Sequence, residues 1–161
     1  MRVWLAVMLM LLAGSAAAAD WGHYVNPRFG YAIDLPPGFV GQGESTNGDG
    51  QLFKTPTALL AVYGMNMVDV DFETEVRQDQ EDAQHDGWNI TYQMSTPSAA
   101  SYSGIKGGRV LYARMIVLCG ETLAGFAVEY SRADIPAFDP VIARLLRSLK
   151  ATDGSVACPT N

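Results

Sequence analysis

The chain has 161 residues, with 11 Lys and Arg against 17 Asp and Glu, and a formal net charge of −6 at pH 7. An acidic balance of this size disfavours nucleic acid and anionic membrane surfaces as partners, because both are bound mainly through Lys and Arg. The length corresponds to one domain, which can bury enough surface to fold without a structural metal.

A secretory signal peptide is predicted over residues 1–19. Arg2 gives a positive start, residues 3–12 form an unbroken apolar run, and small residues precede a cleavage site after Ala19. The apolar run is too short for a membrane span, so we expect no stable membrane anchor. These features predict a periplasmic or secreted protein with one domain over residues 20–161.

Strands and two helices follow one another along the predicted domain. Alternating or continuous apolar residues predict strands, and a spacing of three to four residues predicts helices. A polar, glycine-rich loop is expected over residues 41–50. We expect strands over 21–25, 29–35, 51–54, 58–67, 88–94, 101–105, 109–119 and 122–130, and helices over 71–86 and 140–149.

The strands over 58–67 and 109–119 are apolar on both faces, which indicates a sheet that is covered on both sides. The helix over 71–86 has one apolar face and can supply one cover. The second helix is expected to begin with Asp139 as N-cap and Pro140 at its first position. The predicted fold is α+β, an antiparallel β-sheet covered by helices on both faces.

This element order resembles the PsbP-like α/β/α sandwich superfamily. The likeness is carried by Tyr24, the run from Phe29 to Phe39, the loop 47–50 before a strand, and the closing Asp139-Pro140 helix. Members of the superfamily include an extrinsic photosystem subunit, a nuclear-import cofactor and uncharacterised exported bacterial proteins. The resemblance to the bacterial exported branch implies a small, non-enzymatic accessory or binding domain.

Cys119 and Cys158 are the two cysteines of the chain. In an oxidising compartment they are expected to form a disulfide, which stabilises by about 4 kcal/mol on the chain-entropy model. The alternative is two free thiols. Neither cysteine belongs to a Cys-x-x-Cys pair, so thiol–disulfide exchange chemistry is not indicated.

Acidic and polar residues mark one candidate interaction surface. Carboxylates recur at helical spacing on the first helix, where like charges three or four residues apart are locally unfavourable. They can bind a cation or a basic partner, or they can form a solvated face that keeps the chain soluble. The candidate surface consists of Glu44, Asn47 and Asp49 in the loop, and of Asp71, Glu75, Asp79, Asp82 and Asp86 on the helix.

No motif for catalysis, a cofactor or a metal is found. His23 and His85 lie on different elements, without the spacing of a zinc site. The loop 47–50 resembles part of a calcium-binding loop, but Pro56 stands where the bidentate carboxylate is required. We therefore expect no cofactor and no metal.

The predicted function is an exported, soluble binding or accessory domain. Its partner, a protein or a small ligand, is not identified by the sequence. The alternative is an envelope hydrolase that uses carboxylates such as Asp34, Asp49 or Glu129 as acid and base. A deep pocket with two convergent carboxylates of shifted pKa would favour the hydrolase, and a shallow surface would favour binding.

Overall fold

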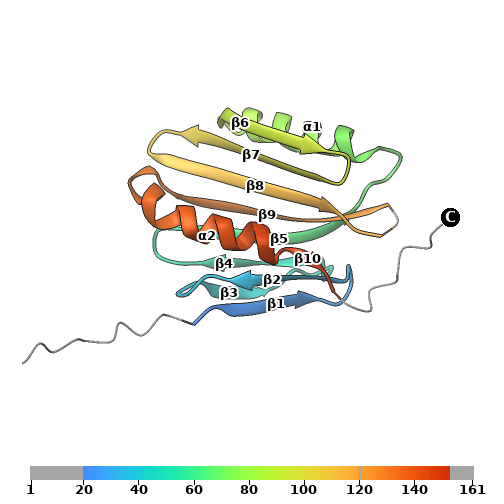
Figure 1. Cartoon of the computed structure of the whole chain (residues 1–161), viewed down its shortest axis with the longest axis horizontal. Helices are drawn as coiled ribbons and strands as arrows, with labels where there is room; N and C mark the ends of the chain where they lie inside the picture. The colour runs from blue at the N-terminus through green and yellow to red at the C-terminus, as the bar shows by residue number, and fades with distance from the viewer. Residues whose placement is uncertain (1–19, 120, 153–161) are drawn as a thin grey trace, which may run out of the picture.

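The computed structural model describes residues 20–119 and 121–152 as a large and a small antiparallel β-sheet with two helices (Figure 1). The large sheet has the strand order β3-β4-β5-β9-β8-β7-β6, and the small one the order β1-β2-β10. The helices are α1 (Phe72–His85) and α2 (Ile135–Ser148), the latter preceded by a 3₁₀ turn, η1 (Arg132–Asp134). The strands are β1 (Gly22–Asn26), β2 (Tyr31–Leu35), β3 (Val40–Glu44), β4 (Gly50–Lys54), β5 (Leu59–Asn66), β6 (Asn89–Thr96), β7 (Ala99–Lys106), β8 (Arg109–Val117), β9 (Thr122–Ser131) and β10 (Lys150–Ala151).

The central strands of the large sheet divide its apolar side chains between two clusters. Along β8, Val110 and Tyr112 belong to one cluster, and Leu111 and Ala113 to the other. Successive side chains of a strand point to opposite faces, so this alternation follows from the doubly apolar pattern of the sequence.

Each cluster includes residues from one helix. Ile142 and Leu145 of α2 join the cluster that also holds Tyr31 and Ile33 of the small sheet. Phe72, Val76 and Ala83 of α1 join the other cluster. In Figure 1, α2 crosses in front of the large sheet, and α1 lies at its β6 edge.

Helix α1 agrees with the prediction over 71–86. Asp71 is the N-cap, and its side chain accepts a hydrogen bond of 2.8 Å from the Thr74 amide. The helix ends before Gly87, which has a φ of 92° and can adopt this left-handed conformation because it lacks a Cβ.

Helix α2 begins earlier than predicted. It starts at Ile135, with Asp134 as N-cap, so Pro140 lies inside the helix and Asp139 is not the cap. An interior proline removes one main-chain hydrogen bond. Phe138 stacks on Tyr130, with ring centroids 4.1 Å apart, and so packs the first turns of the helix against β9.

The predicted loop over residues 41–50 is also shorter than expected. Residues 40–44 form β3, an edge strand paired with β4 through an irregular register between Gly41 and Glu44. Every residue of β3 is exposed, so no apolar alternation marked it as a strand. The short β10, which pairs with Ala32 and Tyr31 of β2, was missed for the same reason.

Two sequence predictions involve residues outside the described ranges 20–119 and 121–152. The signal peptide over 1–19 and Cys158 both lie there, so cleavage after Ala19 and the Cys119–Cys158 disulfide stay predictions. Among the described residues, no helix has the length and apolar character needed to cross a membrane.

Candidate functional site

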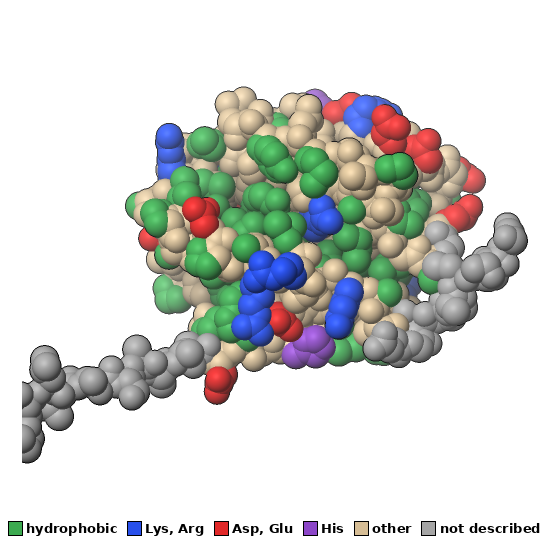
Figure 2. Space-filling view, viewed as in Figure 1, with side chains coloured by type: hydrophobic (Ala, Val, Ile, Leu, Met, Phe, Trp, Pro, Cys, Tyr) green, Lys and Arg blue, Asp and Glu red, His purple; other side chains and the backbone are tan. Residues whose placement is uncertain are grey.

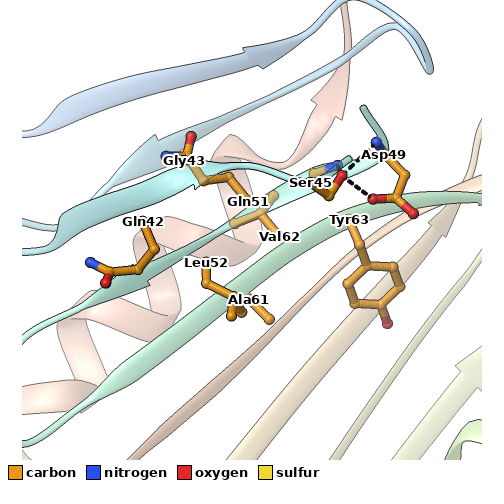
Figure 3. Close-up of a pocket in the computed structure, with 10 residues that line it drawn as sticks. Gln42, Gly43, Ser45, Asp49, Gln51, Leu52, Ala61, Val62 and Tyr63 are labelled. Atoms are coloured by element: carbon orange, nitrogen blue, oxygen red, sulfur yellow. Dashed lines mark hydrogen bonds between the residues drawn. The ribbon is translucent and has the colours of Figure 1, made fainter. Parts of the chain in front are cut away.

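A groove lies on β3, β4 and β5, and we call it the Tyr63 groove (Figure 3). Its volume is about 310 Å³. Leu52 of β4 and Ala61 of β5 are register partners on its floor, and the Leu52 side chain is 42% exposed. Its lining consists of Gln42, Gly43, Ser45, Asp49, Gly50, Gln51, Leu52, Ala61, Val62 and Tyr63.

Tyr63 lines the groove, and its register partner on β9 is Gly125. A Cβ at Gly125 would lie 2.6 Å from Cζ of the Tyr63 ring, so only glycine lets the ring cross the strand here. Burial raises the pKa of the Tyr63 hydroxyl, and the negative charges of Asp79 and Glu75 raise it further. The tyrosine is therefore protonated and under the electrostatic influence of helix α1.

Three carboxylates of α1 act on one another, and we call Glu75, Asp79 and Asp82 the α1 acidic ridge. Burial raises the pKa of Asp79, and the charge of Asp82 raises it further. A hydrogen bond of 2.6 Å from the Tyr102 hydroxyl acts in the opposite direction. Burial and the charges of Asp79 and Asp82 likewise raise the pKa of Glu75.

The ridge contains the central part of the predicted carboxylate stripe. The two outer members of the stripe have positions at the helix ends, since Asp71 is the N-cap and Asp86 the C-cap of α1. The hydrogen bond from Thr74 lowers the pKa of Asp71. Within residues 20–119 and 121–152, no group of three or more His, Cys, Asp or Glu is arranged to hold a metal ion.

The loop residues of the predicted surface are bound to the small sheet. Asn26 is fully buried and donates hydrogen bonds to the Gly48 carbonyl (2.9 Å) and to the Glu44 carboxylate (3.2 Å). The Tyr24 hydroxyl lies 2.8 and 2.9 Å from the two Glu44 carboxylate oxygens. Glu44 therefore connects the end of β3 to β1.

Asp49 organises the turn between β3 and β4. Its carboxylate accepts hydrogen bonds from the Ser45 hydroxyl (2.5 Å) and the Asn47 amide (2.7 Å). These bonds, the one from Ser45 above all, lower the pKa of Asp49. Its carbonyl accepts a bond of 3.0 Å from the Tyr31 hydroxyl. Figure 3 shows Ser45 and Asp49 at one end of the groove.

Comparison of the chain with protein-family models and with curated protein sequences finds no match. Solved structures do match. The Ran-binding protein Mog1p of Saccharomyces cerevisiae superposes with a TM-score of 0.63 at 10% identity, over 86% of this chain and 98% of Mog1p. Cyanobacterial PsbP from Synechocystis sp. PCC 6803 gives 0.62 at 13% identity, over 86% and 96% of the two chains. A mutant of Mog1 gives 0.63 at 11% identity, over 84% and 98%.

The chain has the PsbP/Mog1-like fold. This confirms the predicted likeness to PsbP and the predicted α+β class, with a mostly antiparallel sheet and two helices. Identities of 10–13% show a shared fold and bring no functional residue from those proteins to this chain.

Within the PsbP/Mog1-like fold, the carboxylates considered for hydrolysis have separate partners. Asp34 bonds to Arg144 at 2.8 Å and lies 3.2 Å from His23, and these contacts outweigh burial and lower the pKa of Asp34. Glu129 lies 3.9 Å from Arg109. The carboxylates of Asp34, Asp49 and Glu129 thus have different neighbours, with no partner in common among those described.

Sequence reasoning missed the tyrosines and the asparagine that build the site. Tyr63 and Tyr102 lie within the predicted strands over 58–67 and 101–105, and Tyr102 is 3% exposed. No periodic signal distinguishes a core tyrosine whose hydroxyl reaches a carboxylate. Asn26 had one signal, its place before Pro27 in a turn, where asparagine side chains bond to nearby main chain.

Proposed function

We propose that this chain is an exported accessory module that binds a protein partner through the Tyr63 groove and the α1 acidic ridge. The main support is the groove itself, which is open and has a partly apolar floor. Tyr63 in its lining feels the negative charges of Glu75 and Asp79 on the ridge. A shallow groove of this kind favours binding over catalysis.

The two parts of the surface define the chemistry of the partner. Leu52 and Ala61 offer an apolar floor, which favours an aliphatic or aromatic side chain. Two carboxylates of the ridge, Glu75 and Asp79, are partly buried, and burial together with the negative charge of their neighbours raises their pKa values. A Lys or Arg of the partner would relieve that repulsion, so we expect a basic segment with one apolar anchor.

The fold comparison favours a protein over a small ligand as partner. Mog1p is described as a Ran-binding protein, so a chain with this fold can present a protein-binding surface. The identity of 10% brings neither Ran nor any contact residue to the present chain.

We also propose that a helix covers each face of the large sheet and that the protein is exported. The division of α1 and α2 between two clusters supports an α/β/α sandwich with a helix on each face of the large sheet. The composition of residues 1–19 supports export, and an exported chain supports a Cys119–Cys158 disulfide. Intact-mass measurement of the native protein, before and after reduction, tests the cleavage that export requires and the disulfide. A native chain that retains Met1 contradicts export.

A pair of matched variants tests the surface. Leu52 in the groove and Met94 on β6 are 42% and 41% exposed, and both lie on strands of the large sheet. Partner capture from a native extract by the immobilised protein should fall about tenfold in Leu52→Lys, because the new cation opposes a basic partner. Met94→Lys should retain capture.

Equal capture by Leu52→Lys and the wild type would exclude the groove as the contact surface. High salt should release the captured partner, because a contact with the ridge is partly electrostatic. Capture that is insensitive to salt contradicts the assigned role of the ridge.

The alternative of an envelope hydrolase has one observation in its favour. Glu75 and Asp79 interact and both have a raised pKa, as a general acid requires, although neither lines the groove. Release of soluble products from isolated envelope material, abolished by combining Glu75→Gln with Asp79→Asn, would favour the hydrolase. Absence of release by the wild type would favour the binding module.

A further inference from the structure

A second cavity, distinct from the Tyr63 groove, collects basic side chains between α2 and the small sheet. Its volume is about 440 Å³. We call it the basic cavity. Figure 2 shows blue Lys and Arg side chains on this face, with a purple His beside a red carboxylate. The lining residues are His23, Asp34, Arg144, Arg147, Ser148 and Lys150.

Several elements meet at this cavity. His23 of β1 and Asp34 of β2 are register partners across the small sheet. The Asp34 amide donates a hydrogen bond of 3.1 Å to the Ser148 hydroxyl, which ties β2 to the last turn of α2. Lys150 follows on β10, opposite Ala32. The main chain therefore fixes the relative positions of the basic residues.

Asp34 is the single carboxylate in the lining, and both of its oxygens are engaged. Oδ2 accepts a hydrogen bond of 2.8 Å from Nε of Arg144, and Oδ1 lies 3.2 Å from Nδ1 of His23. The Arg144 guanidinium also lies over the Trp21 ring, 4.2 Å from its centroid. Asp34 and Trp21 thus hold Arg144 in place. The hydrogen bond to Asp34 uses Nε of Arg144 and not the two terminal nitrogens of its guanidinium.

Two cationic side chains of the lining have no partner of opposite charge among the described residues. Among the described residues, the side chains of Arg147 and Lys150 take part in no ion pair or hydrogen bond, and both residues are exposed. The lining holds three cationic side chains, Arg144, Arg147 and Lys150, and one carboxylate, Asp34. The cavity therefore has an excess of two positive charges, in a chain whose net charge is −6.

The helix dipole accounts for only part of this arrangement. Cations near a helix C-terminus are stabilised by the helix dipole, which explains Arg147 in the last turn of α2. It does not explain Lys150 beyond the helix or His23 on another element, nor why these side chains share a cavity.

We propose that the basic cavity binds a phosphate group. A phosphate monoester carries close to two negative charges at neutral pH, which matches the excess of two cations. Arg147 supplies a planar fork for two phosphate oxygens, and Lys150 supplies a point charge. Asp34 is a positioning residue that orients Arg144. The proposal does not depend on the proposed function of the Tyr63 groove.

The phosphate can belong to a soluble molecule or to a lipid headgroup, and the two sources are separable by experiment. Inorganic phosphate tests the soluble source by calorimetric titration at constant ionic strength, with chloride as the reference anion. Phosphatidylcholine vesicles with and without phosphatidic acid test the lipid source by co-sedimentation. The net negative charge of the chain opposes anionic membranes, so we expect the soluble source.

Matched variants decide the outcome. Combining Arg147→Gln with Lys150→Gln should weaken phosphate binding at least tenfold, because both unpaired cations are lost. Combining Lys54→Gln with Arg132→Gln changes the net charge equally at exposed sites outside the cavity lining and should leave affinity unchanged. Arg147→Lys keeps the charge without the fork and should lose only part of the affinity.

Saturable binding of phosphate or of phosphatidic acid vesicles that depends on Arg147 and Lys150 supports the proposal and identifies the source. The proposal is overturned if neither probe binds, or if the control pair weakens binding as much as the cavity pair. Leu52→Lys should bind phosphate like the wild type, so failure of the groove and failure of the cavity are distinguishable.

Discussion

Two contacts between a tyrosine and a carboxylate lie in different parts of the molecule and have opposite electrostatic surroundings. At the β3–β4 turn, Glu44 accepts from Tyr24 at 2.8 and 2.9 Å and from Asn26 at 3.2 Å. On α1, Asp79 accepts from Tyr102 at 2.6 Å and faces the charge of Asp82.

The difference separates a carboxylate that holds the fold together from one that is available to a partner. Donors surround Glu44, so its charge stabilises the turn. Asp79 has one neutral donor and acidic neighbours, so its charge is unfavourable in the isolated protein. Both residues belong to the predicted interaction surface, and of the two it is Asp79 that faces the negative charge of a neighbouring carboxylate.

Substitution of Gly50 should have the largest effect and tests the rigidity of the turn. A Cβ at this position would collide with the Val62 carbonyl oxygen, and the β4–β5 pairing prevents the main chain from moving away. We expect Gly50→Ala to lower the free energy of unfolding by at least about 3 kcal/mol in urea titration. Gly108→Ala, with no atom within 4 Å of the added Cβ, should change it by less than about 0.5 kcal/mol.

Asn26→Ala should have the next largest effect, because it leaves buried donors and acceptors of the turn without their partner. The Asn26 side chain donates to Gly48 and Glu44 and accepts a hydrogen bond of 2.9 Å from the Phe29 amide. We expect a loss of about 2–3 kcal/mol in the free energy of unfolding. The exposed Asn89 on β6 provides the control, and equal losses in Asn26→Ala and Asn89→Ala would contradict the assigned role.

Apolar periodicity explains which elements could be predicted. The doubly apolar strands β5 and β8 and the capped helix α1 were predicted close to their observed bounds, because burial imposes a pattern on them. Strand β3 has no buried residue and therefore no pattern. The predicted start of α2 is wrong because Pro140 resembles a first helical residue, whereas the helix begins at Ile135 and contains Pro140.

The sites depend on contacts between residues that are remote in the chain. The stripe on α1 follows from helical spacing, but the hydrogen bond that Asp79 accepts from Tyr102 of β7 does not. The basic cavity joins His23 with Lys150, from opposite ends of the described chain. Local patterns carry no information about such convergence, which tertiary packing creates.

Neutralising Glu44 and Asp79, each in its own variant, should have different effects on the free energy of unfolding. Glu44→Gln removes the charge that strengthens the hydrogen bonds from Tyr24 and Asn26, and should cost about 1–2 kcal/mol of unfolding free energy. Asp79→Asn keeps an oxygen for Tyr102 and removes an unfavourable charge, so stability should be equal or higher. Both are measured by urea unfolding at neutral pH, and a larger loss in Asp79→Asn than in Glu44→Gln would contradict the comparison.

The pH dependence of unfolding gives the smallest and most specific test, because the pKa shifts of Asp49 and Asp79 have opposite signs. Hydrogen bonds lower the pKa of Asp49 in the folded state, so its ionised form stabilises the protein above the unfolded value of 3.8, and this stability disappears as the pH falls through the folded pKa. Burial raises the pKa of Asp79, so the wild type loses stability as the pH rises from 3.8 through the folded pKa. Relative to the wild type, Asp79→Asn should therefore gain stability with rising pH and Asp49→Asn should lose it. Urea titrations across the acidic range measure both differences. Two differences with the same sign would mean that the turn and the ridge do not differ in the way proposed.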